Sequence, residues 1–359
     1  MPLIQKRYVD SLGAYMTTVS TIAGEDAQNS LHPPILWFRG QSDVRYSLIP
    51  SLFRTKAHAE FVNGGYTKLH YAEDIRTQHY IAKNFHLLEK EPSSRVEWLE
   101  VMQHHLVKTR VLDWSESSLH SLLFALEPFF DEIKFSESSR RKCVPCVWVL
   151  SPGELNKSIM KYLKINKKLQ SDLLDDLGVG ASEKKEILRT FDAYRNFEKY
   201  SETEDTNHID YIFNLSSIND EILRDSGRLK ELLLKGDVMN PYYYLLVRIY
   251  SDGYVLDQRE LAPLCVVHPY HSERIKAQKG VFTVFPFYKE QNMDALLRKN
   301  SVNPDAMERN PMTEGCLWQI QINNPQKIAL EMLENGMNDS WLYPEMPVVS
   351  SEIENHRIL

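Results

Sequence analysis

The pattern of apolar and polar positions predicts helices in the first part of the chain. Apolar residues recur at roughly helical spacing over residues 8–22 and again over residues 67–90, which favours two amphipathic helices. A third helix is expected after Pro92, because Ser93 or Ser94 can cap it and a glutamate stands near its N3 position.

The segment that follows predicts a connection and then a fourth helix. The polar stretch KTRVLDWSESS indicates a break in regular structure. The apolar stretch LHSLLFALEPFF predicts a helix that ends at Pro128 or soon after, because proline disrupts a helix interior. Residues 131–142 are charged and serine-rich, and we expect a surface loop there.

Short runs of β-branched and aromatic residues predict the strands. The run ILWF, stopped by Gly40, is the first of them. Further strands are predicted over CVPCVWVL, YYYLLVRIY, LCVVHPY, VFTVFPF and CLWQIQI. The last helix is expected over PQKIALEMLENG, with Gly336 at its carboxyl-terminal cap.

This order of elements predicts an α+β fold with a mixed or antiparallel sheet and flanking helices. Residues 154–236 are polar and mostly helical in pattern, and they include the acidic stretch SETEDTNHID. We therefore expect one α+β domain made of residues 1–153 and 237–359, interrupted by a helical insertion or subdomain over 154–236.

Composition places the chain among ordinary globular proteins. Of its 359 residues 43% are hydrophobic and 25% are charged, and the net charge is −7. That charge argues against a protein that coats nucleic acid, although a local basic groove is compatible with it. With four cysteines, no stretch resembling a signal peptide and no long apolar span, the sequence predicts a cytoplasmic protein without a membrane segment.

The first candidate for chemistry is the corner Trp37-Phe38-Arg39-Gly40-Gln41. A buried strand would deliver Arg39 to its end, where a planar guanidinium suits a phosphate or a carboxylate. Gly40 would permit close backbone approach and Gln41 would add a hydrogen-bonding amide. The alternative is that Arg39 pairs with an interior acid and has a structural role.

The second candidate is EVMQHHLVKTRVLDWSESS, residues 100–118. Here His104 with Asp113 could serve acid–base chemistry, whereas adjacent histidines on a helix diverge too far to share one metal ion. Arg110 and Asp113 could instead pair with each other inside the protein. Trp114 is a candidate either for the core or for stacking on a planar ring.

A third polar corner contains Gln278 and Gly280 just before an apolar strand, where an ordinary turn glycine is the simpler explanation. Cys143 and Cys146 form a CxxC without a second pair, and packing within a strand is the expected role. No metal site is expected, and the chain has no Walker A, GxGxxG, HExxH or GxSxG motif.

These corners resemble the FRG domain family, named for a Phe-Arg-Gly triplet. The family pattern is similar to WFRGQSDVRYSLIPSLFR, then to QHHLVKTRVLDWS, then to Arg274, Ile275, Gln278, Gly280 and Phe282, and finally to LENGMNDSWLYPEM. The resemblance spans most of the chain and is weakest over 154–236. His105, Leu106 and Lys108 stand where the family has tyrosine, glycine and proline, so this loop is expected to differ.

More distantly, the strand ending in aromatic-Arg-Gly resembles arginine-type ADP-ribosyltransferases, although Gly280 stands where their glutamate would fall. The resemblance implies an ADP-ribosyltransferase-like or NAD-cleaving enzyme, a toxin in bacterial anti-phage defence, with NAD as co-substrate and a protein or nucleic-acid acceptor. Because that glutamate is missing, Asp113 is our candidate for the carboxylate, with Glu273 as a reserve. We predict catalytic roles for Arg39, His104, Asp113 and Gln278, and ligand contacts from Arg39, Gln41, Arg110 and Trp114. The alternative is a non-catalytic module that binds a nucleotide-like phosphorylated ligand, a peptide or nucleic acid.

Overall fold

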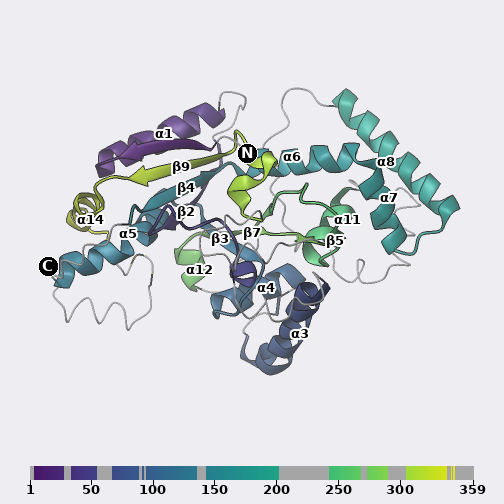
Figure 1. The fold of residues 1–359 in the computed structure, drawn as a ribbon, viewed down its shortest axis with the longest axis horizontal. Helices are drawn as coiled ribbons and strands as arrows, with labels where there is room; N and C mark the ends of the chain where they lie inside the picture. The colour runs from purple at the N-terminus through teal and green to yellow at the C-terminus, as the bar shows by residue number, and fades with distance from the viewer. Residues whose placement is uncertain are drawn as a thin grey trace.

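A mixed sheet of seven strands forms the centre of the described part of the molecule (Figure 1). The computed structural model describes residues 4–27, 34–54, 67–88, 91–92, 94–135, 143–201, 242–267, 273–289, 305–337, 341 and 343. The strand order is β1-β9-β4-β2-β3-β7-β6, with β1 parallel to β9 and the other neighbouring pairs antiparallel. The predicted α+β class with a mixed sheet is therefore confirmed.

The strands of this sheet are β1 (Gln5–Val9), β2 (Trp37–Gln41), β3 (Val111–Ser115), β4 (Cys146–Leu150), β6 (Leu264–Val266), β7 (Gly280–Val284) and β9 (Leu317–Ile322), and β5 (Val255–Leu256) pairs separately with β8 (Phe287–Tyr288). The longer helices are α1 (Leu12–Ala27), α3 (Thr67–Asn84), α4 (Arg95–His104), α5 (Ser118–Phe135), α6 (Pro152–Ile165), α7 (Lys167–Asp176), α8 (Ala181–Ser201) and α14 (Pro325–Glu334). Short helical segments are η1 (Ser51–Arg54), η2 (Phe85–Leu87), α11 (Tyr242–Leu246), η5 (Val247–Ser251), α12 (Glu273–Ala277), η6 (Met307–Arg309) and η7 (Pro311–Thr313).

The central strand β2 shows how the sheet divides two apolar cores. Trp37 packs into one core and its neighbour Phe38 into the other, as alternation along a strand requires. In Figure 1, α1 and α14 lie beside the β1–β9 end of the sheet, and α6, α7, α8 and α11 gather at the opposite end. Helix α4 lies on a third side, next to β3, and α3 packs beyond α4.

Gly40 is the residue that lets α5 pack directly on β2. A Cβ atom at this position would lie 1.9 Å from the carbonyl oxygen of Ser121 and 2.7 Å from the amide nitrogen of Ala125. Both atoms belong to the α5 backbone and cannot swing aside, so any side chain at residue 40 would push the helix away. The glycine that ends the first predicted strand is thus fixed by helix–strand contact.

Several predicted elements are confirmed and three are wrong. The Ser94 side chain accepts a hydrogen bond from the Glu97 amide at the start of α4, as its capping pattern predicted. KTRVLDWSESS is not a loop, because it contains β3, and YYYLLVRIY is not a strand, because it forms α11 and η5. Helix α5 does not end at Pro128 but continues through it to Phe135, where the predicted loop was placed; 136–142 lie outside the described residues.

The helical pattern predicted from residue 154 onward is confirmed as far as Ser201 by α6, α7 and α8, and residues 202–241 lie outside the described ranges. Helix α6 is tied to the sheet at β6. The Asn156 side chain donates to the Cys265 carbonyl at 2.8 Å and accepts from the Cys265 amide at 2.9 Å. This paired amide contact joins the helical segment to the end of the sheet.

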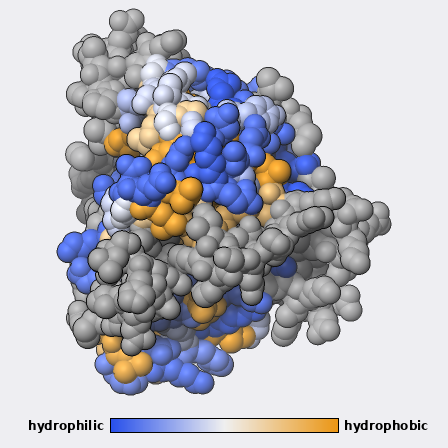
Figure 2. Space-filling view, turned by 90° about the vertical axis from the view of Figure 1, so that its left-hand side faces the viewer, coloured by the Kyte–Doolittle hydropathy of each residue, from blue (hydrophilic) through white to orange (hydrophobic). Residues whose placement is uncertain are grey.

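In the coloured part of the face shown in Figure 2, hydrophilic residues predominate and patches of hydrophobic residues lie between them. Among the helices that the structure describes, none combines the length and the apolar composition needed to cross a lipid bilayer.

Candidate functional site

A cleft of about 720 Å³ opens beside the centre of the sheet. Residues of β2, β3 and β7 form its floor, and α4, α5 and α12 supply its walls. Its size falls within the range of roughly 300–1,000 Å³ that is typical of small-molecule sites. Arg39, His104, Asp113 and Gln278, the four predicted catalytic residues, all line it, as do Gln41 and Trp114.

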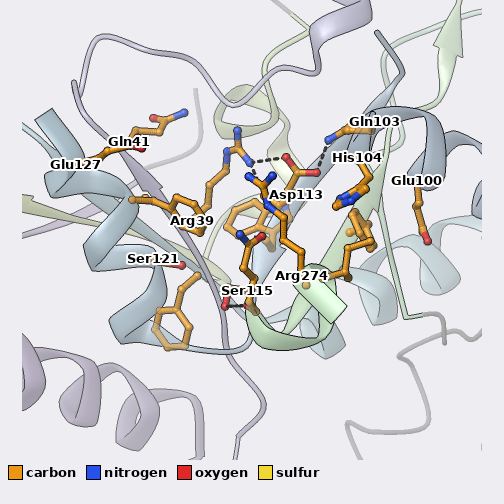
Figure 3. A pocket seen from close by; sticks show the side chains of 18 of the residues that line it. Arg39, Gln41, Glu100, Gln103, His104, Asp113, Ser115, Ser121, Glu127 and Arg274 are labelled. Atoms are coloured by element: carbon orange, nitrogen blue, oxygen red, sulfur yellow. Dashed lines mark hydrogen bonds and ion pairs between the residues drawn. The ribbon is translucent and has the colours of Figure 1, made fainter. Parts of the chain in front are cut away.

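Arg39 and Asp113 form the polar centre of this cleft (Figure 3). Nη1 of Arg39 donates to the backbone carbonyl of Asp113 and lies 3.6 Å from its Oδ2. The Arg39 side chain is 19% exposed, whereas that of Asp113 is 54% exposed. Burial lowers the pKa of Arg39 and the charge of Asp113 opposes that shift. The Arg39 side chain is therefore largely buried and fixed by the protein, while the Asp113 carboxylate faces the open space of the cleft.

The other carboxylate oxygen of Asp113 is held by α4. The Gln103 side-chain nitrogen donates to Oδ1 of Asp113, and Thr109 donates through its hydroxyl to the Gln103 side-chain oxygen. That second bond fixes which end of the amide faces Asp113. The carboxylate therefore accepts a hydrogen bond from Gln103 on one oxygen and forms an ion pair with Arg39 on the other, which gives it a defined orientation. Gln103 was identified in the sequence motif but was assigned no role there.

Two further arginines line the cleft. Desolvation lowers the pKa of Arg54, the positive charge of Arg39 lowers it further, and Asp113 opposes both effects. Arg274 enters from α12, and in Figure 3 its side chain extends toward Arg39 and Asp113. Three carboxylates, Glu100, Asp113 and Glu127, line the same cleft as these three arginines, so the formal charges of the six side chains balance. Asp113 is the carboxylate that raises the pKa of both Arg39 and Arg54 against desolvation.

Gln278 reaches the site at the turn between α12 and β7. Its backbone carbonyl accepts from the Ser115 hydroxyl at 2.7 Å, which ties this turn to β3. The residue with left-handed backbone geometry is Lys279, with φ of 49°, rather than Gly280. Gly280 matters for another reason: a Cβ there would lie 2.9 Å from a methyl group of Ile275. The turn-glycine interpretation is therefore corrected to one of close packing.

Arg110 is the predicted ligand-binding residue that the structure places elsewhere. Its side chain is 0% exposed, and Nε donates to the Glu73 carboxylate at 3.0 Å. The remaining nitrogens donate to the carbonyls of Phe285, Tyr250 and Ser251 at 2.8–3.0 Å. Because these four acceptors surround a guanidinium that does not line the cleft, Arg110 is a structural residue, and neither the ligand contact nor the proposed pairing with Asp113 is correct.

Trp114 and Gln41 line the cleft but have partners within the protein. The Trp114 indole nitrogen donates to the Thr283 hydroxyl at 3.1 Å, and the ring belongs to the apolar core. The Gln41 side-chain oxygen accepts from the indole nitrogen of Trp148 at 2.8 Å. Trp114 therefore offers little ring surface to a ligand, while the amide nitrogen of Gln41 keeps its donors.

His104 ends α4 at the wall of the cleft, on the same side of Asp113 as Gln103 (Figure 3). Its ring makes an edge contact with His105, with centroids 5.1 Å apart. The reserve carboxylate, Glu273, does not line the cleft; it is exposed and lies 3.5 Å from Lys276 on the same helix. Glu273 is therefore excluded as a group that points into this site.

Four residues that the fold brings here were given no functional role from the sequence alone, namely Tyr46, Glu100, Glu127 and Arg274. Arg274 stood in a recognised motif, but nothing in its local pattern indicated a role. Tyr46 is 56% exposed and presents the open aromatic face that Trp114 lacks. Its position inside the motif WFRGQSDVRYSLIPSLFR was the one available signal.

No metal centre was predicted. Within the described ranges, no three His, Cys, Asp or Glu side chains gather as metal ligands would. Cys143 and Cys146 are free thiols, and Cys146 is buried in β4, where burial raises its pKa to about 12.

Comparison with known families supports the resemblance carried by these motifs. The family model for the FRG domain matches residues 34–132, the segment that contains β2, α4, β3 and most of α5. The chain carries an FRG domain. A search of curated proteins and a search of solved structures each gave no match, and the ADP-ribosyltransferase resemblance stays a prediction.

The FRG domain supplies Arg39, Asp113 and Gln103, which form the polar centre of the cleft. Arg274 and Gln278 come from beyond the matched residues. The cleft is therefore built jointly by the FRG domain and by the strand and helix that follow the helical segment.

Proposed function

We propose that the cleft binds NAD, or a similar dinucleotide, and cleaves the bond between its nicotinamide and ribose. The product ADP-ribose would pass to water or to a protein or nucleic-acid acceptor. The observation that carries this proposal is the exposed Asp113 carboxylate, held by Arg39 and Gln103 inside a cleft of nucleotide size. An oriented carboxylate facing open space is the group that glycosidic cleavage requires.

The chemistry follows from the position of this carboxylate. When the glycosidic bond breaks, its electron pair leaves with the nicotinamide nitrogen and positive charge develops on the ribose. A fixed negative charge beside the ribose lowers the energy of that oxocarbenium-like transition state. An oxygen or nitrogen nucleophile then bonds to the ribose carbon and loses its proton. His104, at the wall of the same cleft, is our candidate acceptor of that proton.

The arginines suit the other half of the ligand. Arg39 and Arg54 repel each other, which is one reason why the pKa of Arg54 is lowered. A diphosphate between the two guanidinium groups would relieve that repulsion, and its oxygens would accept hydrogen bonds from several of their N–H groups. Nε of Arg39 is buried without a hydrogen-bond partner among the described residues, and a buried donor of this kind calls for an acceptor. Tyr46 offers the exposed ring for a base.

The direct test is incubation of the purified protein with NAD, with and without cell extract as acceptor, and measurement of released nicotinamide. Release should fall by about 100-fold or more in Asp113→Asn, which keeps the shape but removes the charge. Asp172→Asn is the matched control, because this aspartate lies on α7 and pairs with Lys168 away from the cleft. No release by wild-type protein under any of these conditions would exclude the proposal.

One observation favours a second candidate, a binding module without turnover. Arg39 already neutralises part of the Asp113 charge through contacts within the protein. In that case, ADP-ribose would bind with an affinity that falls steeply with salt, and NAD would remain intact. An enzyme that depletes NAD would suit a toxin in anti-phage defence, and arrested growth on expression, absent for Asp113→Asn, would support that role.

A further inference from the structure

Arg274 combines a position at the cleft with an unusual support. Its Cζ atom lies 4.6 Å from the centre of the Tyr343 ring, a distance typical of a cation–π contact. Among the described residues, no carboxylate lies within ion-pair distance of Arg274. The Arg274 guanidinium thus lines the cleft, stacks on an aromatic ring and pairs with no acid among the described residues. It is well placed to bind an anion.

Tyr343 is itself held against the wall of the cleft. Its ring meets that of Phe124 edge to face, with centroids 6.5 Å apart, and Phe124 lines the cleft from α5. Two residues earlier, Trp341 makes a similar edge contact with His120 on the same helix, at 6.1 Å. Trp341 and Tyr343 therefore both contact α5, and Tyr343 bridges α5 to Arg274 on α12.

We propose that Arg274 is an anion-binding residue of the cleft and that Tyr343 is the positioning residue that holds its guanidinium ready. The ligand group is a phosphate or diphosphate, because the planar guanidinium can bond two oxygens of one phosphate. This inference deepens the proposed function and relies on it only for the identity of the whole ligand. It makes residues far beyond the FRG domain match part of the site.

Calorimetric titration with ADP-ribose and with inorganic pyrophosphate tests this proposal. Arg274→Gln should weaken the binding of both probes by about ten-fold or more, as expected for the loss of a charge-assisted hydrogen bond. Tyr343→Leu should weaken it by about three-fold, and Tyr343→Phe, which keeps the ring, should bind like wild type. Tyr8→Leu is the matched control, because this exposed tyrosine lies on β1, away from the cleft.

The double variant decides whether Tyr343 acts through Arg274. Once Arg274 is glutamine, Tyr343→Leu should weaken binding no further. An equal loss in both backgrounds, or no loss in either, would overturn the positioning role. If Tyr343→Leu does not fold, Arg274→Lys replaces it in the test: the charge stays but the planar group is lost, and wild-type affinity for pyrophosphate would overturn the proposal.

The same variants separate this inference from the proposed function. If the wild type releases nicotinamide and Arg274→Gln binds both probes as tightly as the wild type does, the role of Arg274 is refuted and the proposed function stands. If the wild type binds pyrophosphate through Arg274 but leaves NAD intact, the catalytic proposal is refuted and the anion-binding role of Arg274 stands. Absence of binding of either probe to the wild type would overturn the anion site.

Discussion

Replacement of Arg110 by methionine should lower the free energy of unfolding, because it removes contacts that hold β3 in place. The residues that line the cleft should keep their arrangement. The arginine directly precedes β3 and joins three separate parts of the chain. It pairs with Glu73 on α3 and donates to the carbonyls of Tyr250 and Ser251 in η5 and of Phe285 after β7. Methionine fills similar space but can donate to none of these acceptors.

The expected loss is dominated by the charge left behind. Glu73 is only 1% exposed, and its remaining cation, Arg95, lies 3.6 Å away. Removal of one partner from a buried ion pair costs about 3–5 kcal/mol, and each buried carbonyl left without a donor adds to the cost. We expect Arg110→Met to lower the free energy of unfolding by about 4 kcal/mol. Addition of Glu73→Gln should recover part of this loss, because the unpaired buried charge disappears.

Urea unfolding followed by tryptophan fluorescence measures this effect, with the midpoint and slope fitted for the wild type, both single variants and the double variant. Titration of the surviving folded protein with ADP-ribose supplies the second measurement, and its affinity should be unchanged. A loss of less than about 1 kcal/mol together with lost ADP-ribose binding would refute the structural role. It would restore the ligand-contact role that the sequence predicted for this arginine.

Three further changes test other parts of the structure. Gly40→Ala should destabilise the fold by about 3 kcal/mol or more in urea unfolding, because the added Cβ meets the Ser121 backbone; unchanged stability would contradict the contact between α5 and β2. Leu106 has φ of 63° and is 92% exposed, so Leu106→Gly should raise the thermal midpoint by relieving about 1 kcal/mol of left-handed strain, whereas a lower midpoint would show that its side chain packs in solution. Burial raises the pKa of Glu308, which accepts from the Leu48 amide at 3.0 Å, so its contribution to stability is full at low pH and is lost as pH rises through that raised pKa. Glu308→Gln should flatten this part of the pH–stability curve, and an unaltered curve would exclude the assignment.

The sequence predicted the site better than it predicted the elements that build it. Arg39, Asp113 and Gln278 share one cleft as expected, because each stands at a polar corner beside an apolar run. Arg110 was misplaced because β3 was interpreted as a loop. Arg110 directly precedes β3 and is buried against Glu73, whereas Asp113 lies within the strand and faces the cleft, so the two side chains do not share a ligand.

Two other errors in the predicted secondary structure have physical causes: the burial of one segment and the edge position of another. YYYLLVRIY is rich in aromatic and β-branched residues, but it is buried on most sides, and such a run lacks the periodicity that separates a helix from a strand. The strand β1, QKRYV, was missed because it lies at an edge and is mostly polar. The contact between Tyr343 and Arg274 joins residues remote in sequence, and no local pattern encodes it.

The central claim is that the Asp113 carboxylate acts on a bound dinucleotide and does not only stabilise the structure of the cleft. Parallel measurement of ADP-ribose affinity and nicotinamide release in wild type and Asp113→Asn tests it most directly. We predict affinity within about three-fold of wild type and release reduced by about 100-fold or more, since the charge is needed in the transition state. Equal release by the two proteins, or affinity and release lost in the same proportion, would contradict this account.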